Sequence, residues 1–416
     1  MNLWAAVILA ALLLDFAVER LADVLNLGHL GRTLPPELRD AYDADRYHRA
    51  QGYARARTRF GILVATVDLA ALLAFWFARG FDRLDQGVRG LGLGGIASGL
   101  VFIGALGLAR AVLALPFGWW STFVIEERFG FNRTTPRTFC ADVAKGALLA
   151  LALGGPLLAA VLWLLAAAGA RAWLWCWLAS ALFLTGVQVI APTWILPLFN
   201  RFTPLPEGRL REAILAYARG VGFPLEDVFV IDGSRRSTKG NAFFTGFGRH
   251  KRVALFDTLI ERLEPGELVA VLAHEVGHYR RGHVVIGLVL AIAQLGLVFW
   301  LLSLCLARPG LFAAFFMHER PLYAGIVFCA LLFTPAERVL AIVLHAIARR
   351  HEAAADAFAV ATTGTGERLA SALKRLAADA LTNPTPHPLH VALHHSHPPV
   401  LARVRALTAP ASARID

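Results

Sequence analysis

The chain has 416 residues, of which 57% are hydrophobic and only 17% charged, and its mean hydropathy is +0.55. These values exclude an ordinary soluble protein and indicate a multi-pass membrane protein in a lipid bilayer. The formal net charge is +11, but the basic residues lie in loops between apolar runs. We therefore attribute them to membrane topology and expect no nucleic-acid partner. The four cysteines are widely spaced and predict neither a disulfide framework nor a zinc knuckle: Cys140, Cys176, Cys305 and Cys329.

Seven apolar runs of adequate length predict seven transmembrane helices. The first is either a short membrane helix or a signal sequence, and we favour the helix because no positively charged segment precedes it. The fifth must bend or break near its end, where prolines stand at 192 and 197. The runs cover residues 1–14, 61–78, 90–109 with a continuation to 113, 146–168, 172–200, 284–307 and 321–348.

Loop charge predicts the orientation of these helices. With seven spans, residues 20–60, 126–145, 201–283 and 349–416 lie on one side of the membrane. The first of these segments alone carries eight arginines, whereas the opposite side has only scattered ones. Because short cytoplasmic loops are enriched in Lys and Arg, we place this side in the cytoplasm and the N-terminus outside.

A polar module at 201–283 follows the membrane domain at 1–200. It contains an amphipathic helix at 210–220, a strand at 228–231, and two apolar runs at 242–246 and 253–256 that predict a hairpin. Glu264, Pro265 and Glu267 then predict the start of a further helix. A helix followed by strands and a second helix is typical of a small α+β metallopeptidase module, in which an exposed strand edge holds an extended substrate. Spans six and seven at 284–348 and a C-terminal segment at 349–416 complete the predicted division.

The second helix carries the motif H-E-x-x-H, formed by His274, Glu275 and His278. A helix places the two imidazoles one turn apart on one face, where both can bind a single zinc ion, one per chain. Glu275 lies between them and is placed to act as the general base on a zinc-activated water. Unpaired histidines and a glutamate are costly to bury on an apolar helix, which favours a metal site here. The zinc-activated water predicts hydrolysis of peptide bonds.

A catalytic zinc needs a third protein ligand from the same side of the membrane. Glu352 follows the seventh span, and Asp356 lies one turn further on, where it can accept the outer N–H of a ligating imidazole. The alternative interpretation is a solvated carboxylate pair compensated by neighbouring arginines. Three histidines compete as ligands: His283 points away from the motif face by its spacing, His345 lies deeper in the span, and His351 precedes Glu352.

The C-terminal segment holds a further group of histidines in a proline-rich setting, which is also typical of a loose metal-binding tract or a solvated linker. One of them can donate to the oxyanion that forms on the scissile carbonyl. Spacing alone does not choose among His387, His390, His394, His395 and His397.

Together these segments resemble the CAAX prenyl protease type 1 family of integral-membrane zinc metalloendopeptidases, over most of the chain. The matching segments are EERFGFN (126–132), PLFNRFTPL (197–205), KGNAFF (239–244), RVALFDTL (252–259), HEVGH (274–278), RRHE (349–352), AD (355–356) and SHPP (396–399).

The resemblance implies seven transmembrane helices around a large enclosed chamber, with the zinc site inside it on the cytoplasmic side. It also implies that His397 stabilises the transition state and that Asn241 contacts the substrate main chain. In the family, the substrate is a C-terminal C-a-a-X peptide with a prenylated cysteine, and its last three residues are removed.

The chain departs from the family at Ala353 and Ala354, where an aromatic and a polar residue are common. Its Ala-, Arg- and Leu-rich composition is typical of bacteria, so we expect the protein in a bacterial inner membrane. A second hypothesis for its function is a quality-control protease for membrane proteins. An intramembrane protease of the site-2 type is disfavoured because charged residues closely flank the motif. A non-catalytic transporter or scaffold is the remaining alternative, in which Asp15, Asp68, Glu337 and Arg338 would mark a pathway.

Overall fold

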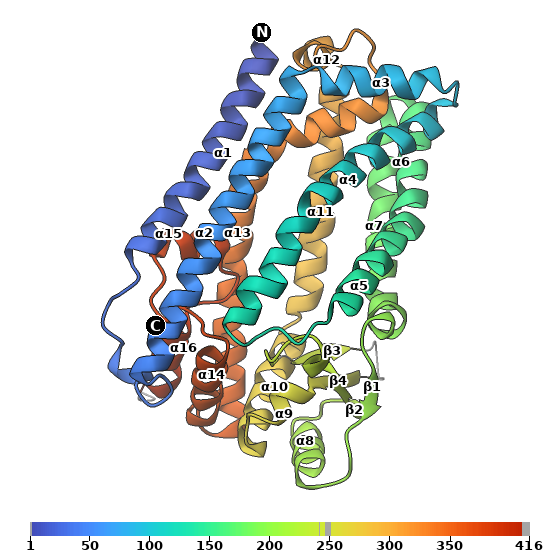
Figure 1. The fold of residues 1–416 in the computed structure, drawn as a ribbon. Coiled ribbons are helices and arrows are strands. Elements are labelled where there is room, and N and C mark those ends of the chain that lie inside the picture. The colour runs from blue at the N-terminus through green and yellow to red at the C-terminus, as the bar shows by residue number, and fades with distance from the viewer. Residues whose placement is uncertain (1, 241, 246–250, 410–416) are drawn as a thin grey trace.

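The computed structural model describes residues 2–240, 242–245 and 251–409. Within this part of the chain, six helices are long and apolar enough to cross a membrane, and they form an elongated bundle (Figure 1). They are α2 (Ala44–Phe77), α4 (Gly95–Trp120), α5 (Pro136–Leu149) continued by α6 (Gly155–Ala167), α7 (Ala172–Ile190), α11 (His283–Leu306) and α13 (Leu322–Thr363).

The seventh expected span is the helix α1 (Leu3–Gly28), which packs along α13. It is longer than the predicted run of 14 residues and carries charged side chains. It is therefore not among the six helices that are apolar enough to cross a membrane. Arg338 of α13 compensates these charges, with Nε 3.0 Å from Asp15 Oδ1 and Nη1 2.8 Å from Glu19 Oε1. Asp68 is likewise paired, at 2.6 Å, with Arg110. These charged groups therefore form ion pairs between helices, as buried charges in a bilayer must.

Several spans are interrupted by short helical segments of other kinds. Three are π-helical, η2 (Ser121–Glu126), η3 (Ala150–Gly154) and η5 (Ala191–Ile195), and η5 with η6 (Leu196–Leu198) makes the predicted bend at the end of the fifth span. Pro156 at the start of α6, which directly follows η3, Pro192 in η5 and Pro197 in η6 remove backbone donors there, which explains the loss of regular helix at these two spans. The other short turns are η1 (Pro36–Leu38), η4 (Gly169–Arg171) and η7 (Gly233–Arg235).

An aromatic core closes the end of the bundle near the N-terminus, beside α3 (Gly80–Gly90) and α12 (Pro309–Ala314) (Figure 1). Phe315 stacks on Trp76 at 4.6 Å and on Phe328 at 3.8 Å between ring centroids, and all three are fully buried. The Trp76 indole also donates to the carbonyl of Ala314 at 2.8 Å, which satisfies its buried N–H. Further along the bundle, α6, α7, α11 and α13 line an apolar cavity of about 690 Å³.

A four-stranded sheet lies at the opposite end of the bundle (Figure 1). Its strands are β1 (Phe202–Pro204), β2 (Leu225–Ile231), β3 (Ala242–Thr245) and β4 (Lys251–Phe256), in the order β1-β2-β4-β3. The predicted strand and hairpin are confirmed, with β3 antiparallel to β4 and at the edge of the sheet. β1 was not predicted because three residues ending in proline are too short to show an alternating pattern.

Helices α8 (Arg209–Gly220), α9 (Asp257–Ile260), α10 (Pro265–Arg280), α14 (Glu367–Asp379), α15 (Pro388–His394) and α16 (Val400–Thr408) complete the fold. The start of α10 is as predicted, and the Glu267 carboxylate accepts from the backbone N–H of Glu264 at 3.0 Å. The helix α13 runs without a break through residue 348, where the sequence suggested a division between the last span and the C-terminal segment. The seventh span therefore carries Glu352 rigidly into the polar end of the molecule. The predicted fold class, an all-α membrane protein with a small α+β module, is confirmed.

Candidate active site

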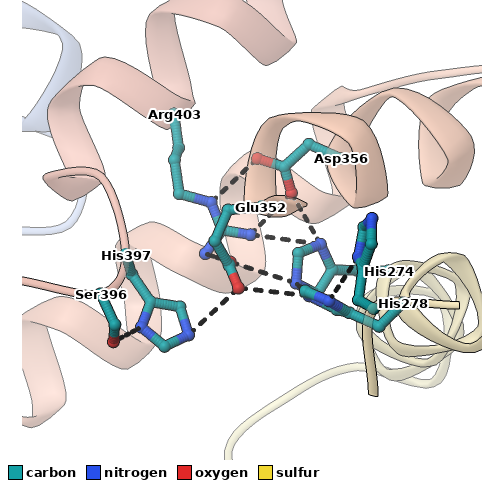
Figure 2. A network of polar contacts seen from close by, with 8 residues as sticks. His274, His278, Glu352, Asp356, Ser396, His397 and Arg403 are labelled. Carbon is teal, nitrogen blue, oxygen red and sulfur yellow. Dashed lines mark hydrogen bonds and ion pairs between the residues drawn. The ribbon is translucent and has the colours of Figure 1, made fainter. Parts of the chain in front are cut away.

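The imidazoles of the H-E-x-x-H motif meet the carboxylate of Glu352 where α10 packs against α13 (Figure 2). The Nε2 atoms of His274 and His278 are 3.1 Å apart, and they lie 3.4 and 3.2 Å from the two Glu352 oxygens. Glycine at position 277 permits this approach, because a Cβ there would lie 3.0 Å from the Cα of Ala355 on α13. Two distant stretches of sequence are thereby brought together at one point.

The arrangement of these three side chains fits a metal ion. The two imidazole nitrogens face each other at 3.1 Å, and each can offer a lone pair to one shared cation. Glu352 is buried, and its Oε2 lies 3.4 Å from Nε2 of His274 and 3.2 Å from Nη1 of Arg403. A buried carboxylate beside two imidazole nitrogens is a donor set that zinc uses.

Asp356, one turn beyond Glu352, lies behind the first histidine of the motif. Its Oδ1 is 2.8 Å from Nδ1 of His274, the ring nitrogen that points away from Glu352 (Figure 2). This contact fixes the orientation of the ring and leaves Nε2 for the metal. Burial alone would lower the pKa of His274, but hydrogen bonds with Asp356 and Glu352 outweigh it and raise the pKa to about 9 in the metal-free protein.

The sequence did not single out Arg403, which lies at the centre of this network. From α16, its Nε and Nη2 contact the two oxygens of Asp356 at 2.9 and 2.6 Å, and its Nη1 is 3.2 Å from Glu352 Oε2. The side chain is almost fully buried. No motif marks this residue: it stands six positions after His397 in an ordinary amphipathic helix, so only the fold identifies it.

Glu275 lines a pocket of about 270 Å³ together with His274 and Glu352. Burial raises the pKa of its carboxyl group, as a proton acceptor near neutral pH requires. Leu369, Leu373 and Leu376 of α14 form an apolar part of the pocket lining. The nonpolar residues that line the pocket are Gly240, Ala242, Leu259, Val271, Leu369, Leu373 and Leu376.

Among the C-terminal histidines, His397 faces the cluster, with Nε2 3.2 Å from Glu352 Oε1 (Figure 2). Its Nδ1 lies 2.9 Å from the hydroxyl of Ser396. His390 and His394 instead face α1, where they lie near Asp23 and Glu19. The structure thus separates His397 from His390 and His394, which spacing along the sequence did not distinguish.

The competing ligands lie outside the three-residue cluster. The Nδ1 of His283 is 3.0 Å from Nδ1 of His278, on the outer side of that ring, and His283 stacks on His351 with centroids 4.0 Å apart. His283 therefore contacts the His278 ring directly, and His351 packs against His283. His345 lies elsewhere on α13, with a buried Nδ1 that has no hydrogen-bond partner among the described residues. Asn241 lies outside the described residues.

Comparison with known proteins identifies the family. Residues 24–201 match the family model for the CAAX prenyl protease N-terminal region with five membrane helices, and residues 204–411 match peptidase family M48. The chain is 33% identical to CAAX prenyl protease 1 of Saccharomyces cerevisiae, over 97% of this chain and 95% of that protein.

A human homolog of CAAX prenyl protease 1 is 32% identical over 90% of this chain and 88% of its own length. The crystal structure of S. mikatae Ste24p is similar across 98% of this chain and 100% of that chain, with a TM-score of 0.93 and 32% identity. Both halves of the chain, the helical bundle and the metal-binding end, therefore have counterparts in this group. The chain is a membrane-embedded metalloprotease that belongs to peptidase family M48, among the CAAX prenyl proteases.

Proposed function

We propose that this chain is a zinc endopeptidase in which His274, His278 and Glu352 hold one zinc ion. The convergence of these three groups from α10 and α13 carries the proposal. Two histidines and one glutamate form a donor set that zinc uses in peptidases. When bound, zinc supplies a Lewis acid that polarises the scissile carbonyl and lowers the pKa of water.

Glu275 accepts the proton of the attacking water, because its carboxylate lines the same pocket and its raised pKa suits a base. His397 donates an N–H to the oxygen of the carbonyl as charge develops there. The Ser396 hydroxyl 2.9 Å from Nδ1 supports this role, because a hydroxyl that donates to Nδ1 keeps the proton of the neutral ring on Nε2. Asp356 and Arg403 position the His274 ring.

The substrate lies extended along β3. This strand pairs on one side with β4 and is at the edge of the sheet, and Ala242 at its start lines the pocket with His274. Extended peptides add to the exposed edge of a sheet as a further strand. Asn241, directly before β3, is the proposed contact to the substrate main chain.

We take the substrate to be the C-terminus of a prenylated protein, from which the enzyme removes a tripeptide. The names of the relatives support this substrate class, as does an apolar cavity between α6, α7, α11 and α13.

The active site faces the cytoplasm, because the arginine-rich loops belong to the same end of the molecule as the sheet. We place the enzyme in a bacterial inner membrane. The proposed membrane domain (1–200) and module (201–283) meet close to the junction of the two family models.

The test is Glu275→Gln in the full chain, assayed with a farnesylated C-a-a-X peptide and with the same peptide without the farnesyl group. We expect cleavage to fall by about 10²–10⁴-fold while the metal is retained, because the glutamine side chain keeps the shape of the glutamate but cannot accept the proton. Glu261→Gln, an exposed glutamate before α10, is the matched control.

Full activity of Glu275→Gln would contradict the mechanism, and a metal-free preparation with full activity would contradict the zinc site. Equal cleavage of the two peptides would contradict the prenyl preference and assign the enzyme to general degradation of membrane proteins.

A further inference from the structure

A second group of metal-ligating side chains lies where α15 packs against α1, apart from the active site. Asp23, His390 and His394 each offer a ligand atom, and these atoms lie within 4.8 Å of one another. The two histidines are four residues apart on α15 and so share one face. The carboxylate comes from a different helix. The arrangement therefore repeats the pattern of the active site, a His-x-x-x-His pair facing a carboxylate.

The cluster has open coordination positions. The His390 imidazole is largely buried, its Nδ1 has no hydrogen-bond partner among the described residues, and its Nε2 is 3.8 Å from Asp23 Oδ1, beyond hydrogen-bond reach. The ring of His394 lies beside it, with centroids 4.5 Å apart. Arg20 contacts the other oxygen of Asp23 at 3.1 Å and leaves Oδ1 facing the histidines. His390 Nε2 and Asp23 Oδ1 are too far apart for a hydrogen bond, and a cation between them would give both atoms a shared partner.

The charge around the cluster also favours a cation. Asp15, Glu19 and Asp23 project from α1 at intervals of four residues, and they face the guanidinium groups of Arg20 and Arg338. Three carboxylates against two guanidiniums leave one negative charge uncompensated. Glu19 lies 3.3 Å from His394 Nε2, so a second carboxylate adjoins the ligand group.

We propose that Asp23, His390 and His394 bind a second divalent cation, of the borderline class to which zinc belongs. Two imidazoles and one carboxylate are typical ligands of such ions, whereas magnesium and calcium prefer oxygen ligands alone. Glu19 adjoins the site and either contributes an oxygen or orients His394.

The cation would join the C-terminal segment to the first membrane helix. α15 ends at His394, and the chain passes directly through His395 and Ser396 to His397, which faces Glu352 in the active site. The carbonyl of His395 is also held at 2.8 Å by Arg349 of α13. A bound ion on α15 therefore sets the position of His397 from three residues away. The role of this ion is structural, so it does not depend on the proposed role of the first metal.

The test is a zinc titration of the full chain in detergent, after removal of metal and in competition with a chelator of known affinity. We expect wild-type protein to bind about two equivalents of zinc, and His278→Ala, which loses an active-site ligand, to keep about one. The combined variant Asp23→Asn and His390→Asn should also keep about one, with the remaining site unchanged and the lost site weakened about 100-fold or more. His395→Asn, beside the proposed ligands, is the matched control and should bind as wild type.

Wild-type protein that binds a single equivalent overturns the proposal, as does a His278→Ala protein that binds none. The His278→Ala arm keeps α1 and α15 intact, so a folding defect in the double variant does not blur the result. Thermal unfolding of His278→Ala adds a second readout: zinc should raise its Tm, and no shift would contradict the site. A failure of these arms leaves the Glu275→Gln experiment unaffected, because that experiment concerns the first metal alone.

Discussion

The Arg403 guanidinium forms a two-pronged ion pair with Asp356, with Nη2 2.6 Å from Oδ1 and Nε 2.9 Å from Oδ2. Asp356 in turn contacts the outer nitrogen of His274 at 2.8 Å. A residue of the C-terminal helix α16 thus determines how a histidine of α10 faces the metal, through a carboxylate on α13. Side chains that hydrogen-bond to metal ligands usually serve to fix the orientation of those ligands.

Replacement of this arginine should weaken metal binding. We expect Arg403→Met to lower zinc affinity about 10–100-fold, because Asp356 loses its fixed orientation and an unpaired buried carboxylate remains. Chelator competition measures the affinity. Arg405→Met is the control: two residues along α16, Arg405 is mostly exposed and pairs with Glu37. An affinity loss of similar size in both variants would indicate a general defect of α16.

The stability of the metal-free protein should fall as pH rises from about 6.5 to 9. Burial lowers the pKa of His274, but hydrogen bonds with Asp356 and Glu352 outweigh burial and raise the pKa from 6.5 to about 9. A folded-state pKa above the unfolded one contributes stability that is complete below pH 6.5 and lost as pH passes through the folded value. Tm measured in excess EDTA at a series of pH values tests this.

The variant His274→Asn supplies the comparison for the pH experiment, because it lacks the titrating ring. Its Tm should vary less over the same pH range. Parallel curves for the two proteins would show that another group causes the pH dependence. Zinc-loaded wild-type protein should also lose the effect, because the ligating imidazole is already unprotonated.

Gly277→Ala should damage both stability and metal binding. The added Cβ would lie 3.0 Å from the Cα of Ala355 and 3.1 Å from its carbonyl oxygen, so α10 must move away from α13. We expect a loss of about 1–3 kcal/mol of stability, as for other overpacked interiors, and weaker zinc binding. Gly287→Ala on α11 meets open space and is the control. Unchanged zinc affinity in Gly277→Ala would show that the helices adjust without moving the ligands.

Lys239→Met should raise KM with little change in metal content. The Lys239 ammonium donates to Glu126 at 3.0 Å and to the Tyr53 hydroxyl at 2.8 Å, and it holds the segment that leads into β3. Because β3 is the proposed substrate strand, we expect KM to rise about 10-fold, a loss of about 1.4 kcal/mol in binding. Steady-state kinetics with a peptide substrate measure the effect. Arg57→Met removes an exposed partner of the same Glu126 and should change KM less; an equal rise in both would assign the effect to Glu126 itself.

The amino-acid sequence by itself determined the membrane class, the positions of most helices, the hairpin and the H-E-x-x-H motif. These features depend on local patterns: apolar runs, alternation along strands, and spacing along one helix. Glu352 and Asp356 were also predicted, because a carboxylate pair one turn apart followed the last span on the side of the motif.

The tertiary structure decided what local patterns do not encode. α1 carries three acidic residues, and only its contact with Arg338 shows how a charged helix belongs to the bundle. Arg403 lies in the active site and His390 lies outside it, near Asp23, because the packing of α15 and α16 against other helices sets the direction of each side chain. Contacts between residues far apart in sequence depend on how helices meet in three dimensions, and sequence spacing fixes directions only within a single helix.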